Sequence, residues 1–178
     1  MSQTINSETT AYSGKVFTVR KVNVFLPDGK QKDFDLIEIQ NAVTILPIDN
    51  KNRVYFVDQY RIGAKKTLLE LPAGKVEAGE DPLLTAKREL REEIGMAARE
   101  VSLIGSFYMT PGYASEYMYC YLATGLYASS LPPDSDEFIK IQKIPLEVVY
   151  EMIEQGKIED SKTLAAFMLA AQLLKHRD

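Results

Sequence analysis

The segment from Gly74 to Met96 constrains the fold and the function of this chain more than any other. Asp81 followed by Pro82 is typical of a helix start, with an N-cap carboxylate and a proline at the first helical position. Gly95 is typical of the residue just past a helix end. Apolar side chains recur between these signals at helical spacing and predict one buried face: Leu83, Ala86, Leu90 and Ile94.

Three glutamates lie close to this apolar face. Glu89 and Glu93 are one helical turn apart on its flank, and Glu92 lies farther round the helix. Like charges at this spacing repel one another, so they do not stabilise the helix. A cation above them would explain the pattern, because carboxylate oxygens are the ligands that hard divalent cations prefer. A solvated acidic face is the alternative interpretation.

The wider pattern resembles the signature of the Nudix hydrolases. Gly74, Glu80 and the segment Arg88–Met96 match that signature at every specified position. At ordinary residue frequencies, seven fixed letters co-occur at a given start on the order of once in 10⁸ tries. The resemblance implies an enzyme that hydrolyses a phosphoanhydride bond with a divalent metal ion, Mg²⁺ or, as a possible substitute, Mn²⁺.

The resemblance also implies roles for single residues of the motif. Glu89 and Glu93 would supply two anionic metal ligands from a rigid helix, and Glu92 would add to the same cluster. Ala73, directly before the first glycine, would contribute its backbone carbonyl. Glu92 and Glu93 also belong to the implied catalytic set. Two further residues are interpreted as structural partners that orient the loop and the helix: Glu80 and Arg88.

Length and composition predict a single folded domain with an ordinary core. The chain has 178 residues, of which 46% are hydrophobic and 26% are charged. A net charge of −4 gives no electrostatic footprint for nucleic acid or for an anionic membrane. The single cysteine, Cys120, lies in an apolar run and is interpreted as a buried strand residue. No apolar run approaches the length of a membrane span, and we expect a cytoplasmic protein.

The order of the predicted elements indicates an α+β fold. Residues 1–12 are expected to be a flexible N-terminus, 13–40 an antiparallel β meander or arm, and 41–178 the catalytic domain. The Nudix resemblance implies an α/β/α sandwich, with a mixed β-sheet between helices. After the motif we expect strands over 100–108, 116–123 and 138–144, and helices over 145–155 and 162–175. The last helix has an apolar side that we expect to be buried: Leu164, Phe167, Met168, Ala171 and Leu174.

Two segments outside the motif resemble the ADP-ribose pyrophosphatase branch of the family. Thr110–Glu116 is similar to that branch's Ser-Pro-Gly-x-x-Ser-Glu segment, which implies that Pro111 and Gly112 bind substrate. It also implies that Glu116 lies near the metals or the terminal ribose. A plain β-turn at Pro111 is the alternative. Arg61 stands in a Gln-x-Arg-Ile segment, which implies a bidentate contact with a substrate phosphate; a surface cation is the alternative.

An acidic loop before the last predicted strand resembles the loop that carries a catalytic glutamate in the same branch. Glu137 aligns best and would serve as general base for the attacking water. Asp134 and Asp136 are the fallbacks, and a solvated loop is the alternative. Aromatic side chains of the meander are candidates for stacking on a base, each of them also a candidate core residue: Tyr12, Phe17, Phe25 and Phe34.

The function implied by the resemblance is metal-dependent hydrolysis of the pyrophosphate bond in a nucleoside diphosphate sugar. ADP-ribose is the expected substrate, and AMP and ribose 5-phosphate are the expected products. Another nucleoside diphosphate sugar such as GDP-mannose is one alternative. A Nudix fold without catalytic activity, used to bind a ligand, is another, although Glu89, Glu92 and Glu93 are all present. The resemblance further implies a homodimer.

Overall fold

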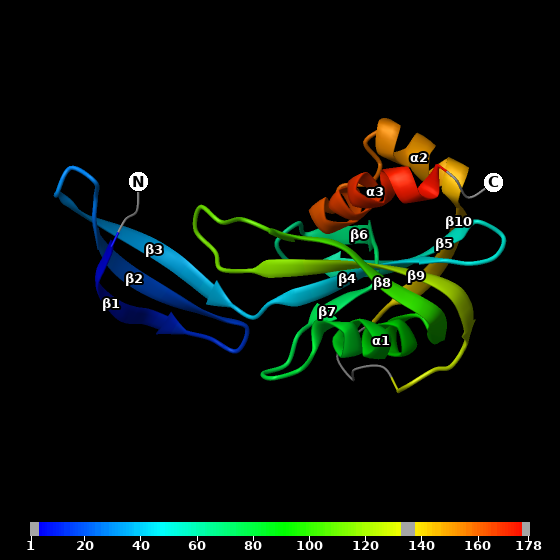
Figure 1. Cartoon of the computed structure of the whole chain (residues 1–178), viewed down its shortest axis with the longest axis horizontal. Coiled ribbons are helices and arrows are strands. Elements are labelled where there is room, and N and C mark those ends of the chain that lie inside the picture. The colour runs from blue at the N-terminus through cyan, green and yellow to red at the C-terminus, as the bar shows by residue number, and fades with distance from the viewer. Residues whose placement is uncertain (1–3, 133–137, 176–178) are drawn as a thin grey trace. The chain divides into compact units, whose positions relative to one another are not determined.

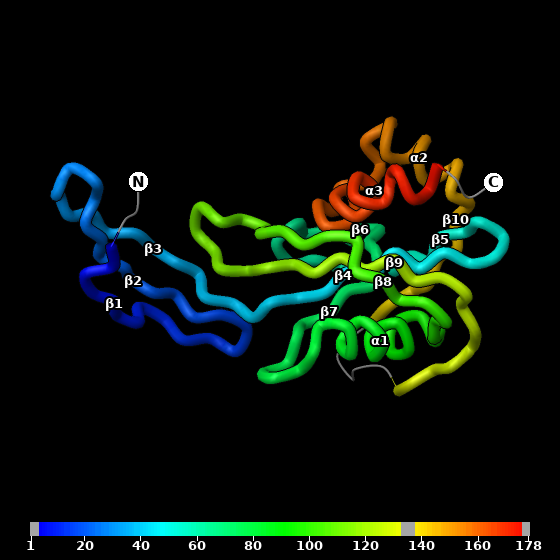
Figure 2. The backbone as a smooth tube through the Cα atoms, in the orientation of Figure 1, coloured from blue at the N-terminus to red at the C-terminus, as the bar shows by residue number. Residues whose placement is uncertain are grey.

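A computed structural model describes residues 4–132 and 138–175 of the chain, which divide into two compact units (Figures 1 and 2). The first, here called the meander unit, contains the residues up to Asn41 together with Phe107–Tyr117. The second, here called the sandwich unit, contains Ala42–Ser106 and the described residues from Met118 onward. The segment 107–117 thus belongs with the meander, whereas the sequence places it in the catalytic domain.

The meander unit contains a three-stranded antiparallel sheet in the order β1-β2-β3. Its strands are β1 (Thr4–Ser13), β2 (Phe17–Phe25) and β3 (Gln31–Ile39). This corrects the expectation of a flexible N-terminus from Thr4 onward. The polar residues of β1 are ordered because their backbone N–H and C=O groups pair with those of β2. All ten residues of β1 are nevertheless exposed.

The loop between β8 and β9 is hydrogen-bonded to β3 inside the meander unit. The amide of Ile37 donates to the carbonyl of Tyr113 at 2.7 Å, and the amide of Ser115 donates to the carbonyl of Ile37 at 2.9 Å. The Ser115 hydroxyl also accepts a hydrogen bond from the amide of Ile39 at 3.0 Å. These contacts explain why the loop clusters with the meander, although the chain enters and leaves it through strands of the sandwich unit.

The sandwich unit is built on a seven-stranded mixed sheet. Its central order is β10-β5-β4-β9-β8, with β6 paired to β5 and β7 paired to β4. Strand β4 runs parallel to β9 and antiparallel to β5 and β7. All seven residues of β4 are buried, as expected for a strand covered on both faces. The strand bounds are β4 Ala42–Ile48, β5 Arg53–Arg61, β6 Lys66–Glu70, β7 Ala73–Lys75, β8 Met96–Tyr108, β9 Tyr117–Ala128 and β10 Lys140–Pro145.

Helices cover both faces of this sheet, as the sequence predicts. Helix α1 (Pro82–Glu93) lies on one side, and α2 (Leu146–Glu154) and α3 (Ser161–Leu174) lie on the other (Figure 1). The α/β/α sandwich is therefore confirmed. The core under α1 consists of apolar side chains from the helix and from three strands: Val43, Ile45, Tyr55, Val57, Ala86, Leu90, Ile94, Tyr121 and Ala123.

Helix α1 has the ends that its sequence predicts. The Asp81 carboxylate caps the helix by accepting a hydrogen bond from the amide of Leu83 at 2.9 Å. Gly95 follows the C-cap residue Ile94 and has φ of 67°, a conformation that other residues adopt only with strain. Cys120 is buried in β9, and burial raises the pKa of its thiol to about 12. This confirms its interpretation as a buried strand residue.

Helix α3 buries a different face from the one its apolar residues predict. Phe167 and Leu174 are buried as expected, but the Met168 side chain is 77% exposed. The buried face instead includes Lys162 and Thr163 in the first turn. The reason is tertiary: these two polar side chains find partners under the helix, as described below. Within the described ranges, none of the helices combines the length and the hydropathy that a membrane crossing requires.

Candidate active site

Helix α1 holds two glutamates against the backbone segment that precedes it. Glu89 and Glu93 are 8% and 6% exposed, which is unusual for carboxylates and requires polar or cationic partners. The Glu89 side chain lies directly over Gly74: a Cβ atom at that position would be 1.8 Å from Glu89 Oε1. The glycine before the motif loop is therefore required by the position of the Glu89 carboxylate.

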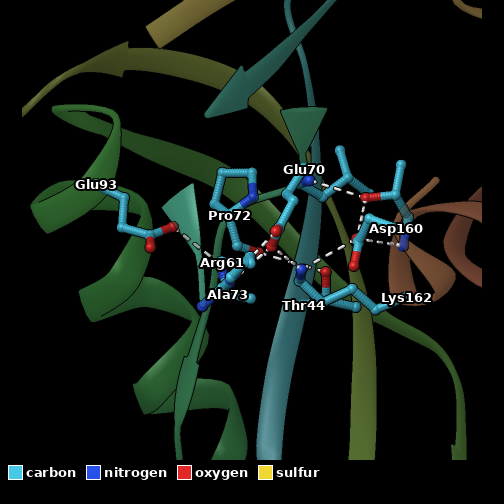
Figure 3. A network of polar contacts seen from close by, with 10 residues as sticks. Thr44, Arg61, Glu70, Pro72, Ala73, Glu93, Asp160 and Lys162 are labelled. Atoms are coloured by element: carbon cyan, nitrogen blue, oxygen red, sulfur yellow. Dashed lines mark hydrogen bonds and ion pairs between the residues drawn. The ribbon is translucent and has the colours of Figure 1, made fainter. Parts of the chain in front are cut away.

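Glu93 is fixed by a backbone contact on the same segment. Its Oε2 accepts a hydrogen bond from the amide of Ala73 at 2.9 Å (Figure 3). The residues predicted to lie together at the metal site, Ala73, Glu89 and Glu93, are thus brought together by α1 and β7. This proximity arises because β7 pairs with the buried strand β4, while α1 packs its apolar face on the same core.

A network of ion pairs, here called the Arg88 network, joins Arg88 to Glu80, Glu89 and Glu92. Arg88 Nη1 lies 2.8 Å from Glu89 Oε1 and 2.7 Å from Glu92 Oε2, and Nη2 lies 3.4 Å from Glu80 Oε2. Partial burial opposes the charge on Arg88, but these carboxylates outweigh burial and raise its pKa. The hydrogen bond from Arg88 also lowers the pKa of Glu80. Both residues thus have the structural contacts that the sequence predicts.

The donor atoms of this site suit a divalent metal ion in kind. Carboxylate and carbonyl oxygens are the hard ligands that Mg²⁺ and related ions prefer. Among residues 4–132 and 138–175, however, no three or more His, Cys, Asp or Glu side chains converge closely enough to hold a metal. Arg88 Nη1 contacts one oxygen of Glu89 and one of Glu92, and the other carboxylate oxygens are not part of these ion pairs. Glu93 is turned toward the amide of Ala73.

Arg61 is paired with a buried carboxylate, although its own side chain is 42% exposed. Its Nε donates to Glu70 Oε1 at 2.8 Å and its Nη2 donates to Glu70 Oε2 at 2.7 Å, a bidentate pair. The hydrogen bond to Glu70 is the main cause of its raised pKa, and the charges of Asp160 and Glu93 add to it. The bidentate face that the sequence assigns to a substrate phosphate is therefore occupied by Glu70.

Glu70 belongs to a second network that the sequence does not reveal, here called the Glu70 network. It consists of Arg61, Glu70, Asp160 and Lys162, which are labelled in Figure 3, together with Thr163. Glu70 is 1% exposed and Lys162 is 6% exposed. Burial opposes ionisation of Glu70, but Arg61 and Lys162 outweigh it, so the pKa of Glu70 lies below its ordinary value.

The remaining predicted site residues lie elsewhere or outside the described ranges. Pro111, Gly112 and Glu116 are in the β8–β9 loop, which belongs to the meander unit. Glu137, and the fallback residues Asp134 and Asp136, fall in the segment 133–137 that the structure does not describe. Their roles stay predictions. Sequence reasoning did not single out three members of the Glu70 network, Asp160, Lys162 and Thr163; the one signal for them was the run of polar residues at the start of the last helix.

Comparison with known proteins places the chain in a family. A family model described as the NUDIX domain matches residues 38–167, which is more than half of the chain. The chain belongs to the NUDIX family. It is 35% identical over 157 residues to an ADP-ribose pyrophosphatase of Bacillus subtilis (strain 168), covering 87% of this chain and 85% of the relative.

Two further similarities extend over almost the whole length. The chain is 35% identical over 179 residues to a methanol dehydrogenase activator of Bacillus methanolicus, covering 98% of this chain and 96% of the relative. A crystal structure of an ADP compounds hydrolase matches with a TM-score of 0.90 and 26% identity, covering 100% of this chain and 98% of the other. These matches include the meander as well as the sandwich, so the relatives share both parts of the chain.

Proposed function

We propose that this chain is a pyrophosphohydrolase that cleaves ADP-ribose to AMP and ribose 5-phosphate. The observation that carries the proposal is the pair of buried carboxylates, Glu89 and Glu93, held against the Ala73–Gly74 backbone by a helix with the complete Nudix motif. Buried acids at this spacing are costly to the fold and are explained by a function that needs them. The similarity to relatives named ADP-ribose pyrophosphatase supports the choice of substrate.

Magnesium is the metal that we propose for the site, with manganese as a possible substitute. Glu89, Glu92 and Glu93, with the backbone carbonyl of Ala73, would hold it. When bound, the ion would neutralise charge on the pyrophosphate and lower the pKa of an attacking water. Arg88 would keep Glu89 and Glu92 in place through its Nη1 contacts. Glu93 keeps its orientation through the amide of Ala73.

Five residues of the proposal serve the substrate and the water. Arg61 would contact a substrate phosphate while its Nε and Nη2 remain on Glu70. Pro111, Gly112 and Glu116 would contact the substrate, and Glu116 would contribute to catalysis near the ribose. Glu137 would accept the proton of the attacking water as general base. We expect Glu137→Gln to lower kcat by about 10²- to 10⁴-fold with little loss of metal affinity; a wild-type rate would transfer this role to another acid.

The experiment that tests the function is a substrate panel assayed with and without magnesium. The panel contains ADP-ribose, GDP-mannose, diadenosine polyphosphates and nucleoside triphosphates, and the products are separated by chromatography. Metal-dependent release of AMP from ADP-ribose, well ahead of the other compounds, is the expected result. Preference for another diphosphate would keep the chemistry and change the substrate. No turnover of any compound would favour a binding protein.

We also propose a cytoplasmic homodimer with no nucleic-acid or membrane partner. Support for the dimer is limited to the meander unit, where every residue of β1 is exposed and large apolar side chains such as Ile5, Tyr12 and Phe25 face solvent. A second copy would cover such a surface. Support for the location is the buried free thiol of Cys120, which fits a reducing compartment. Sedimentation at micromolar concentration tests the dimer, and a monomer would contradict it.

A further inference from the structure

The Glu70 network contains a lysine side chain, Lys162, that is almost fully buried. Lys162 is 6% exposed, although lysine side chains almost never lose all contact with water unless they are paired. Its Nζ contacts Glu70 Oε2 and lies 3.0 Å from Asp160 Oδ2. By contrast, Lys66 at the start of β6 pairs with Glu159 while half of its side chain stays exposed. Burying the Lys162 ammonium group costs desolvation free energy, so a functional reason for its burial is worth seeking.

The contacts of Lys162 form one side of a closed ring between α3 and the end of β6. Asp160 Oδ2 accepts from both the amide and the hydroxyl of Thr163, at 3.0 and 2.6 Å. The Thr163 hydroxyl in turn accepts from the amide of Leu71 at 2.9 Å. Leu71 follows Glu70, and the Lys162–Glu70 contact closes the ring (Figure 3). The first turn of α3 thus clamps two consecutive residues of the segment that leads into the motif.

This ring reaches the proposed active site by two short routes. Along the backbone, the clamped segment continues through Pro72, whose carbonyl accepts from the amide of Ile45 at 2.9 Å, to Ala73 and its contact with Glu93. Through side chains, Glu70 Oε2 is shared between Lys162 Nζ and Arg61 Nη2. The charges balance within the Glu70 network, because its two acids, Glu70 and Asp160, are paired with two bases, Arg61 and Lys162.

We propose that Lys162 is a positioning residue for the substrate. It shares with Arg61 the neutralisation of the buried Glu70 carboxylate, and it thereby leaves Arg61 available to a phosphate. This inference rests on the proposed function, in which Arg61 contacts the substrate. Without Lys162, Glu70 is a buried carboxylate with Arg61 as its remaining cationic partner in the network, and Arg61 is drawn more firmly to it. A guanidinium group held in this way binds a phosphate less well, so the loss appears in substrate affinity.

The first test compares Lys162→Met with Lys66→Met as a matched control. We expect Lys162→Met to raise KM for ADP-ribose about tenfold while kcat stays within about threefold, because ground-state phosphate binding is what is lost. A purely structural role would lower the active fraction and hence apparent kcat, and leave KM unchanged. Lys66→Met is expected to change neither constant, and Lys162→Arg to recover much of the affinity. An unchanged KM in folded Lys162→Met overturns the inference.

A double-mutant cycle asks whether Lys162 acts through Arg61. Arg61→Met is expected to raise KM by itself, and adding Lys162→Met to it should then raise KM no further. Independent, additive effects on KM would overturn the proposal.

Glu70→Gln combined with Lys162→Met covers the case in which the single variant folds poorly. The combined change removes both charges together, so we expect the thermal midpoint to recover and KM to return toward the wild-type value, because no Glu70 charge remains to hold Arg61. A midpoint that recovers while KM stays about tenfold high would overturn the proposal.

Binding of AMP by calorimetry separates this inference from the proposed function. If the wild-type protein turns over no compound of the panel, the proposed reaction is wrong, whatever the variants do. AMP still presents a phosphate to Arg61, and we expect its affinity to fall about tenfold in Lys162→Met and to stay unchanged in Lys66→Met. Equal affinities in the wild type and in Lys162→Met would overturn the role of Lys162, even if the wild-type enzyme is active.

Discussion

The Arg88 network and the Glu70 network have the same ingredients and differ in depth. In both, arginine is paired with glutamate close to the proposed metal site. The Arg88 side chain is 29% exposed and reaches acids within the motif itself, from Glu80 to Glu92. Glu70 is 1% exposed, and its partners come from β5 and from the first turn of α3. The Arg88 network is local and partly solvated. The Glu70 network is long-range, and its Glu70 and Lys162 side chains are buried, whereas Arg61 is 42% exposed.

The difference in burial indicates that the two networks have different roles. A partly solvated ion pair contributes little to stability, since water and salt screen it and the side chains lose entropy. Breaking a buried pair costs much more, because it leaves a charge without compensation. The Arg88 network therefore orders the glutamates for chemistry, whereas the Glu70 network supports the fold and presents Arg61. Each of the following changes tests one side of that contrast.

The largest expected effect is on turnover, from Glu93→Gln. Glutamine keeps an acceptor for the amide of Ala73, so the fold should be retained, but it removes the charge that the proposed metal needs. We expect kcat to fall about 1,000-fold, within the range of a lost catalytic carboxylate. Glu154→Gln, an exposed acid at the end of α2, is the control. Unchanged turnover would contradict the metal assignment. A large loss of stability would show that the proposed metal ligands support the fold as much as the Glu70 network does.

The next effect is on stability, from Glu70→Gln. Removing this carboxylate leaves Lys162 buried with Asp160 alone and takes away the bidentate partner of Arg61. We expect the free energy of unfolding to fall by about 3 kcal/mol, as for other broken buried pairs. Urea denaturation of both proteins at pH 7 measures it. A loss below about 1 kcal/mol would mean that the Glu70 network contributes no more than a surface ion pair does.

The stability effect of Glu70 should depend on pH in one direction. The pKa of Glu70 in the folded protein lies below its ordinary value of 4.5, so its contribution is fully present above that pH. The contribution is lost as the pH falls through the lowered folded-state pKa, because protonation removes the charge that Arg61 and Lys162 stabilise. The difference in unfolding free energy between wild type and Glu70→Gln should therefore be constant from pH 8 to pH 5 and narrow below. A difference that widens in acid would contradict this account.

The smallest expected effect on stability is that of Arg88→Met. Its ion pairs with Glu80, Glu89 and Glu92 are partly open to water, and we expect the loss to be about 1 kcal/mol. Because Glu89 and Glu92 lose the cation between them, we expect kcat to fall by more than the small loss of folded protein would account for. Arg88→Lys, which keeps the charge without the fork, is the control. A destabilisation as large as that of Glu70→Gln would remove the distinction between the two networks.

The motif and the fold class were predictable because their signals are local. The cap at Asp81, the apolar spacing of α1 and the position of Gly95 all lie within one helix and its ends. Helical geometry then places Glu89 and Glu93 on one flank without any knowledge of the rest of the chain. The strands and helices that follow gave the layered architecture, since their hydrophobic patterns demand burial on known faces.

Features that depend on distant partners were not predictable from the sequence. β1 is polar and exposed, and it is a strand because β2 lies beside it. Met168 belongs to the apolar pattern of α3 but stays exposed, while the buried face takes Lys162 and Thr163. By residue type alone a lysine is expected in solvent. Its burial is favourable because it pairs with Glu70, 92 residues earlier in the chain, as well as with its neighbour Asp160.

The sequence by itself determined the family motif, the helix that carries it and the carboxylates available for a metal. Those depend on spacing along one element, which the order of residues fixes directly. The tertiary structure decided which partner holds each charged group: Arg61 is paired with Glu70, and Lys162 lies beneath α3 rather than on its surface. The physical reason is that the energy of a charge depends on its surroundings, and those surroundings come from segments that only folding brings together.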